Sequence, residues 1–95
     1  MAYTLVGKVL KSEVRNPHYP YLPTTTIHVK PDKGQKVPYH PFMDASIVMM
    51  NVRGHHILGG RRIRADYEYC TETLWVRHYD IIDSGGHVLH SEDVS

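Results

Sequence analysis

Residues 61–69 read Arg-Arg-Ile-Arg-Ala-Asp-Tyr-Glu-Tyr, and this stretch decides the fold class. From position 62 onward, charged and apolar side chains alternate, with Arg62 and Arg64 on one side and Ile63 and Ala65 on the other. Successive side chains of a β-strand point to opposite faces, whereas a helix repeats every 3.6 residues. The stretch therefore predicts a strand that is buried on one side only.

Further strands are predicted on both sides of this stretch, separated by turn-forming residues. They are expected over residues 3–10, 24–30, 45–52, 74–82 and 87–90. Residues 45–52 (ASIVMMNV) are mostly apolar, which predicts a central strand buried on both faces. Gly7, inside the first strand, indicates a bulge or sharp bend, and Ser84-Gly85-Gly86 indicates a hairpin.

No convincing amphipathic helix appears, although residues 53–60 have room for one helical turn. The expected fold is all-β: a single domain over residues 1–95, built as a small barrel of five or six strands. Residues 91–95 are expected to form a short mobile tail. Residues 16–23 and 35–43 are rich in proline and tyrosine and are expected to be loops.

Composition excludes several protein classes. With 41% hydrophobic and 22% charged residues, the chain is expected to be globular rather than disordered. No apolar run approaches the ~18 residues of a membrane helix, so no membrane contact is expected. Cys70 is the single cysteine, which excludes an internal disulfide and favours a reducing, cytoplasmic location. A chain this short buries little surface, which favours a homodimer or larger homo-oligomer.

The net charge of +1 conceals a split along the chain. Residues 1–64 hold ten Lys and Arg against three acids, a balance of +7, and residues 65–95 hold one Arg against seven acids, a balance of −6. Such an asymmetry is typical of a protein with one face for a polyanion. Two halves of one sheet that pair through complementary charges would give the same pattern.

The strand order resembles the OB-fold, in three short pieces. Residues 5–15 resemble the first strand and following loop of single-stranded-DNA-binding proteins, and residues 59–65 (GGRRIRA) resemble the entry into their fourth strand. Residues 79–85 (YDIIDSG) are similar to the closing strand of primosomal replication proteins. The resemblance implies a small barrel that binds single-stranded DNA. The proline-rich loops and the lack of a clear helix depart from that pattern.

Basic side chains interleaved with aromatic ones predict contact with single-stranded nucleic acid, because cations track phosphates and flat rings stack bases. Trp75, Arg77 and Tyr79 are expected to share one face of their strand. Tyr19, Tyr21, Lys8, Lys11 and Arg15 are expected to support them from the first strand and loop. The full candidate set is Arg61, Arg62, Arg64, Trp75, Arg77, Tyr79, Tyr19, Tyr21, Lys8, Lys11 and Arg15.

Other interpretations of these residues stay open. Trp75, Tyr67, Tyr69 and Tyr79 equally suit a core or cross-strand pairs, and the arginines suit a solvated face. Asp66 and Glu68 share the face of Arg62 and Arg64, which weakens a phosphate track there. A second function is a protein-binding accessory or inhibitor module, whose Pro-Tyr loops would occupy a partner protein.

Metal and enzyme chemistry have weak signals. Eight histidines and one cysteine include no closely spaced pair of Cys ligands, so neither zinc nor another cofactor is expected. A Cys70–His nucleophile pair has no supporting signature, and no glycine-rich phosphate loop occurs. The chain is therefore expected to bind rather than to catalyse.

Overall fold

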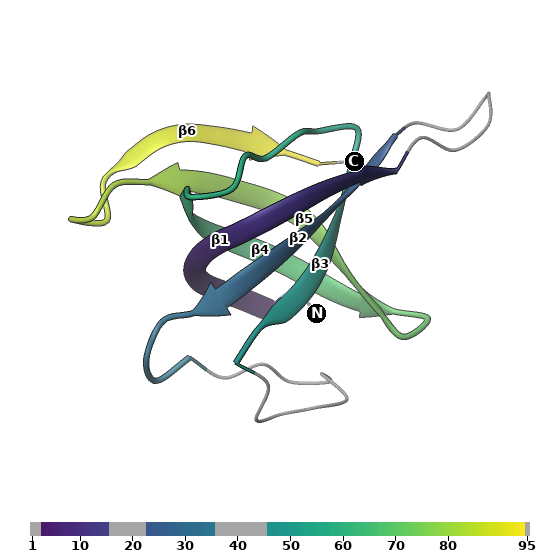
Figure 1. The fold of residues 1–95 in the computed structure, drawn as a ribbon, viewed down its shortest axis with the longest axis horizontal. Coiled ribbons are helices and arrows are strands. Elements are labelled where there is room, and N and C mark those ends of the chain that lie inside the picture. Colours follow the sequence, from purple (N-terminus) through teal and green to yellow (C-terminus); the bar gives the residue numbers. More distant parts are fainter. Residues whose placement is uncertain (1–2, 16–22, 36–45, 95) are drawn as a thin grey trace.

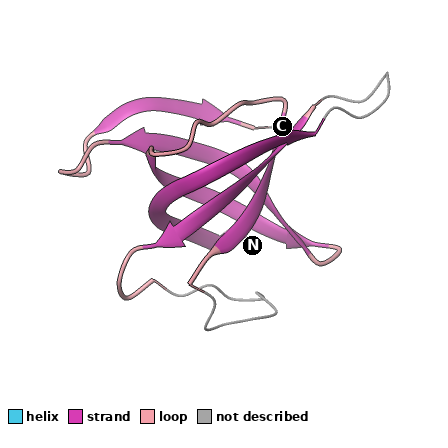
Figure 2. Ribbon diagram, in the orientation of Figure 1, coloured by secondary structure: helices cyan, strands magenta, loops and turns pink. Residues whose placement is uncertain are grey.

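The computed structural model describes residues 3–15, 23–35 and 46–94, and Figure 2 shows strands and loops but no helix among them. This confirms the all-β prediction. The six strands are β1 (Tyr3–Arg15), β2 (Thr24–Pro31), β3 (Val48–Arg53), β4 (Arg62–Cys70), β5 (Thr73–Ile82) and β6 (Val88–Asp93) (Figure 1).

Strand pairing closes the sheet into a barrel. Antiparallel pairing joins the strands in the order β3-β2-β1-β4-β5, and a parallel contact between Asn51 of β3 and Trp75 of β5 completes the ring. The sixth strand, β6, pairs with β5. The molecule is thus a closed five-stranded barrel plus one extra strand, consistent with an OB-like fold. The expected barrel of five or six strands is confirmed.

The first strand pairs with two neighbours, and Gly7 lies where they overlap. Gly7 is opposite Ile63 of β4 and also opposite Pro31 of β2. A Cβ atom at this position would lie 2.3 Å from the carbonyl oxygen of Lys30, so the backbones approach too closely for any side chain. A β-bulge follows at Leu10, where the register with β2 shifts. Together these features let β1 serve both halves of the barrel.

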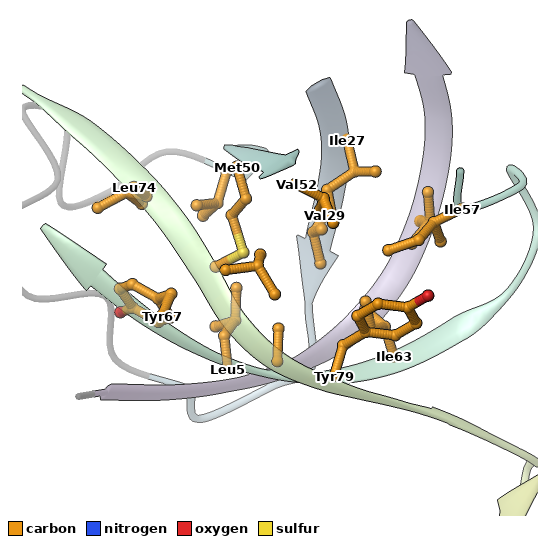
Figure 3. Close-up of a cluster of buried hydrophobic side chains, with 14 of the residues drawn as sticks. Leu5, Ile27, Val29, Met50, Val52, Ile57, Ile63, Tyr67, Leu74 and Tyr79 are labelled. Atoms are coloured by element: carbon orange, nitrogen blue, oxygen red, sulfur yellow. The ribbon is translucent and has the colours of Figure 1, made fainter. Parts of the chain in front are cut away.

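Inward-facing side chains from all five barrel strands fill the core (Figure 3). Leu5, Ile27, Val52 and Ile63 have no exposed surface, and Tyr67 is equally buried. Full burial of one such aliphatic side chain contributes about 1.5–3 kcal/mol to the free energy of unfolding. Within the described residues, the barrel interior is therefore a packed core.

The third strand differs from its prediction. Val48, Met50 and Val52 are buried, but Met49 between them is 52% exposed and Arg53 at the end is also exposed. The prediction of burial on both faces was wrong, because β3 lines a barrel whose outer side faces solvent. The strand also begins at Val48 rather than at residue 45.

A β-bulge in β5 changes which side chains face the core. Asp66 pairs with His78, but the next residue, Tyr67, pairs with Val76, so Arg77 is an extra residue with no register partner on β4. The bulge turns Tyr79 inward, where it is 4% exposed, while Trp75 stays on the outer side and is half-buried. The prediction that Trp75 and Tyr79 share a face was wrong for this reason.

The C-terminal part is more ordered than predicted. Residues 91–93, expected in a mobile tail, continue β6, and the N–H of Val94 donates to the carbonyl oxygen of Arg77 at 2.7 Å. The hairpin signal was correct, since Asp83 Oδ1 accepts hydrogen bonds from the N–H groups of Gly85 and His87. The connector at residues 54–61 contains no helical turn. None of the described segments is a helix able to cross a membrane.

Candidate nucleic-acid interface

Five exposed cations lie on the outer side of β1, β2 and β3. Lys8, Lys30 and Arg53 alternate with buried residues of their strands, so they point away from the barrel, and Lys11 and Arg15 are exposed in the second half of β1. We call this surface the basic face, and its cations are Lys8, Lys11, Arg15, Lys30 and Arg53. The three strands carry one acid, Glu13. The positive half of the sequence therefore becomes a positive surface in space.

Strand register brings cations on different strands side by side. Lys8 of β1 is directly opposite Lys30 of β2, and on its other side it is opposite Arg62 of β4. Arg15 and Arg53 flank Thr24 in a second row across the three strands. Like charges directly opposite each other destabilise a sheet. The fold thus holds these cations together at an energetic cost.

Few acids neutralise the basic face. Lys11 Nζ lies 3.3 Å from Glu13 Oε1, but both side chains are exposed, and such pairs contribute little. In the described part of the chain, no ion pair joins Lys8, Arg15, Lys30 or Arg53 to an acid. These four side chains are available to an external anion.

An aromatic ring adjoins the basic face where the barrel closes. Trp75 is the neighbour of Asn51, and the guanidinium carbon of Arg53 lies 4.9 Å from the centre of the Trp75 ring. This separation is typical of a cation–π interaction. Asn51 Oδ1 accepts a hydrogen bond from Thr26 Oγ1 at 2.8 Å, which orients the Asn51 amide. A half-buried ring, a guanidinium and an amide thus lie together at the edge of the face.

Three of the predicted arginines are already paired with acids. Arg62 donates to both oxygens of Asp32, at 3.1 and 2.6 Å. Hydrogen bonding to Asp32, with its negative charge, raises the pKa of Arg62 above its ordinary value. The other two pairs are Arg64 with Asp80 at 2.7 Å and Arg77 with Glu68 at 3.0 Å. Their charges are used within the sheet, so a phosphate would have to compete with a bound carboxylate.

The remaining predicted residues divide among several places. Tyr79 belongs to the core, and Arg61 lines a groove of about 340 Å³. Tyr19 and Tyr21 lie outside the described residues, as does most of the proline-rich sequence on which the protein-binding alternative depends. The groove is lined by His56, Ile57, Leu58, Arg61, Tyr79, Ile81, Leu89 and His90.

The candidate set predicted from the sequence contains neither Lys30 nor Arg53. Both continue the two-residue alternation of their strands, because Ile27 and Val29 precede Lys30, and Met50 and Val52 precede Arg53, on the buried side. That alternation placed both cations on an outer face. Which strands would be neighbours was not visible, so the clustering of their charges was not predicted.

A second polar cluster joins β4, β5 and β6. Ser91 Oγ lies 3.2 Å from His78 Nε2, and His78 Nδ1 lies 2.7 Å from Asp93 Oδ1. These distances resemble a Ser-His-Asp triad. However, the Ser91 hydroxyl donates to Asp80 Oδ1 at 2.5 Å, and the same oxygen is 3.0 Å from His78 Nε2.

The charges in this cluster argue against an activated serine. Hydrogen bonds to Asp93 and Asp80 raise the pKa of His78, which favours an imidazolium that has no lone pair for the Ser91 proton. The hydrogen bond from Ser91, followed by those from Arg64 and His78, outweighs burial and lowers the pKa of Asp80 to about 2. The cluster is best explained as an ionic connection among three strands. That the chain is not an enzyme stays a prediction.

Neither a metal site nor a known relative indicates a function for this chain. Among the described residues, no group of three or more His, Cys, Asp and Glu side chains is arranged to hold a metal ion. Cys70 is exposed at the end of β4. No protein-family model, no curated protein and no solved structure matches the chain.

Proposed function

We propose that this protein binds single-stranded nucleic acid across its basic face, without catalysing a reaction on it. The observation that carries the proposal is the row in which Lys8 is opposite both Lys30 and Arg62. Of these three cations, Arg62 alone has an acid partner among the residues that the structure describes. A polyanion laid over the row would relieve the repulsion that the register imposes.

The barrel architecture also favours this face as the binding surface. OB-fold barrels bind oligonucleotides on the face of strands 2 and 3 and on the adjoining loops. Here those strands carry Lys30 and Arg53. The turn between β4 and β5 leads into the strand that carries Trp75. This likeness concerns the architecture and supports the proposal without establishing it.

The proposed mechanism combines counterion release with stacking. Lys8, Lys11, Arg15, Lys30 and Arg53 would contact phosphates, and each contact would release counterions from the strand. Trp75 would stack one base, which a single strand can offer and a paired duplex cannot. The proposed binding residues therefore retain Trp75, Lys8, Lys11 and Arg15 from the sequence prediction and add Lys30 and Arg53.

Fluorescence anisotropy of a labelled thymidine oligonucleotide, measured across a salt series, tests the proposal. Five phosphate contacts give a log–log salt slope of about −3 to −4 for a single strand. Lys30→Gln should weaken binding and reduce the magnitude of the slope by about 0.7. Arg61→Gln is the matched control, since it also removes one positive charge, at a residue that lines the groove and is not one of the five cations of the basic face.

Thermal unfolding of the same variants separates a binding role from a structural one. Lys30→Gln removes one member of a like-charged pair, so it should keep or raise stability, by about 0.2–1 kcal/mol, while it weakens binding. No binding at low salt would exclude the proposed function. Equal weakening by both variants would show that the net charge matters and not the basic face.

A further inference from the structure

We propose that β6 is a self-association edge: two copies pair antiparallel along β6, with Ser91 on the two-fold axis and His90 of each copy opposite Glu92 of the other. The resulting dimer joins two barrels through a continuous sheet. The inference does not depend on nucleic-acid binding, because β6 carries none of the residues of the basic face.

The open edge of β6 is the first observation. Within the described residues, β6 is paired with β5 alone, at the end of the strand order. Its side chains are largely exposed, and Val88 and Leu89 are 50% and 62% exposed. Such an edge presents unpaired N–H and C=O groups, and β6 contains neither Lys nor Pro, two residues that often protect an edge, although it carries Glu92 and Asp93.

The backbone direction fixes which residues can pair outward. The N–H of Val94 points toward β5, where it donates to Arg77. Because backbone groups alternate along a strand, Glu92 and His90 also direct their N–H groups toward β5, and Ser91 and Asp93 direct theirs outward. An antiparallel pair centred on Ser91 therefore joins two outward-facing residues, which exchange both hydrogen bonds across the two-fold axis.

Side-chain complementarity selects this register and a second copy as the occupant. With Ser91 on the axis, the imidazole of His90 is opposite the carboxylate of Glu92 of the other copy at two places, and an imidazole N–H can donate a hydrogen bond to a carboxylate. Centring on His90 would oppose two histidines, and centring on Glu92 would oppose two carboxylates. The same strand supplies both members of the pair: His90 Nε2 already lies 3.0 Å from Glu92 Oε1 within one copy. The edge is thus complementary to itself.

Apolar surface lies beside the same edge. Leu89 and His90 line the groove together with Leu58, which is 54% exposed. A second strand placed along β6 would reduce the exposure of Leu89 and add contacts at the groove rim. Burial of apolar surface would then add to the backbone hydrogen bonds.

Sedimentation velocity over a range of concentrations tests the inference. Wild type is expected to dimerise with concentration, and Ser91→Pro to be monomeric, because proline removes the outward N–H. Ser91→Ala is the matched control, since it loses the hydroxyl bond to Asp80 but keeps the N–H, and it should still dimerise. A wild type that stays monomeric at every concentration, or Pro and Ala variants with equal association, would overturn the inference.

A mixing experiment does not depend on whether the proline variant folds. His90→Glu alone and Glu92→Lys alone should each weaken the dimer by about tenfold, because the first places two carboxylates opposite each other and the second removes the carboxylate that would accept from His90. In a mixture, Glu at position 90 meets Lys at position 92 of the other copy, so heterodimers should form more strongly than either homodimer. Heterodimers no stronger than the homodimers would contradict the register.

Discussion

The guanidinium carbon of Arg53 lies 4.9 Å from the centre of the Trp75 ring, at the place where β3 and β5 close the barrel. The two residues are 22 positions apart in the sequence, and the parallel contact between Asn51 and Trp75 brings them together. One ring and one cation therefore meet at the edge of the basic face. A base stacked here would meet both a π surface and a positive charge.

Replacement of Arg53 should affect binding through both properties. Arg53→Ala removes a phosphate contact and the cation–π partner of Trp75, so affinity for a single strand should fall by about 1 kcal/mol or more. Arg53→Lys keeps the charge and should keep the salt slope, but it loses the planar stacking group, so its affinity should be intermediate. Anisotropy titrations measure both effects. Arg53→Ala with wild-type affinity would remove Arg53 from the interface.

The cluster of His78, Asp80, Ser91 and Asp93 predicts how stability varies with pH. The pKa of His78 is raised in the folded protein, so its contribution is fully present below about pH 6.5 and is lost as pH rises through the folded value. The pKa of Asp80 is lowered to about 2, so its contribution is present above pH 3.8 and is lost as pH falls toward 2. Both groups therefore contribute fully to the stability of the fold between about pH 3.8 and pH 6.5.

Urea unfolding of His78→Asn beside wild type checks this prediction. The free energy lost on substitution should be larger at pH 5 than at pH 9, because the stabilising imidazolium of His78 is lost as pH rises through its raised pKa. Subtracting the two curves removes the contributions of the other histidines. Equal losses at both pH values would show that His78 acts by packing and not by charge.

The close backbone contact at Gly7 predicts that even the methyl group of alanine would strongly destabilise the fold at this position. The Cβ of Gly7→Ala would lie 2.3 Å from the carbonyl oxygen of Lys30, and backbone cannot move aside without breaking the pairing of β1 with β2. We expect a loss of about 3 kcal/mol or more. Gly85→Ala is the control, because its Cβ would meet the exposed imidazole of His87 at 3.2 Å. Similar thermal midpoints for the two variants would disprove the close contact.

The turn between β4 and β5 predicts a stabilising change. Thr71 and Glu72 have φ angles of 51° and 61°, in the left-handed region that Asn and Gly adopt more readily. Replacing the pair with Asn-Gly should therefore raise stability, by about 1 kcal/mol or more, and the melting temperature by about 4–8 °C. Calorimetry measures the shift. An unchanged or lower midpoint would show that the turn stores no strain.

Sequence patterns predicted the strands better than the surface that they build. The alternation of residues 61–69 was sufficient to place Ile63 and Ala65 inside, because the period of two is a local property. The bulge at Arg77 depends on how β5 meets β4, so the inward turn of Tyr79 was not visible in the sequence.

Charge neutralisation was hidden for a similar reason. Arg62 and Asp32 are 30 residues apart, and only the pairing of β1 with both β2 and β4 brings them to 2.6 Å. Conversely, Lys8 and Lys30 looked unrelated until the register placed them opposite each other. Residue types and their spacing thus indicated a basic surface, but strand neighbours decided which cations remain available.

The most direct measurement uses the intrinsic fluorescence of Trp75, the single tryptophan of the chain. Titration with a thymidine oligonucleotide of about 15 residues at low salt should quench the emission, and added salt should restore it. Trp75→Phe should retain most of the affinity, whereas Trp75→Ala should lose about 1–3 kcal/mol of binding free energy. Emission unchanged at every oligonucleotide concentration, with no binding seen by anisotropy, would contradict the proposed role of the basic face.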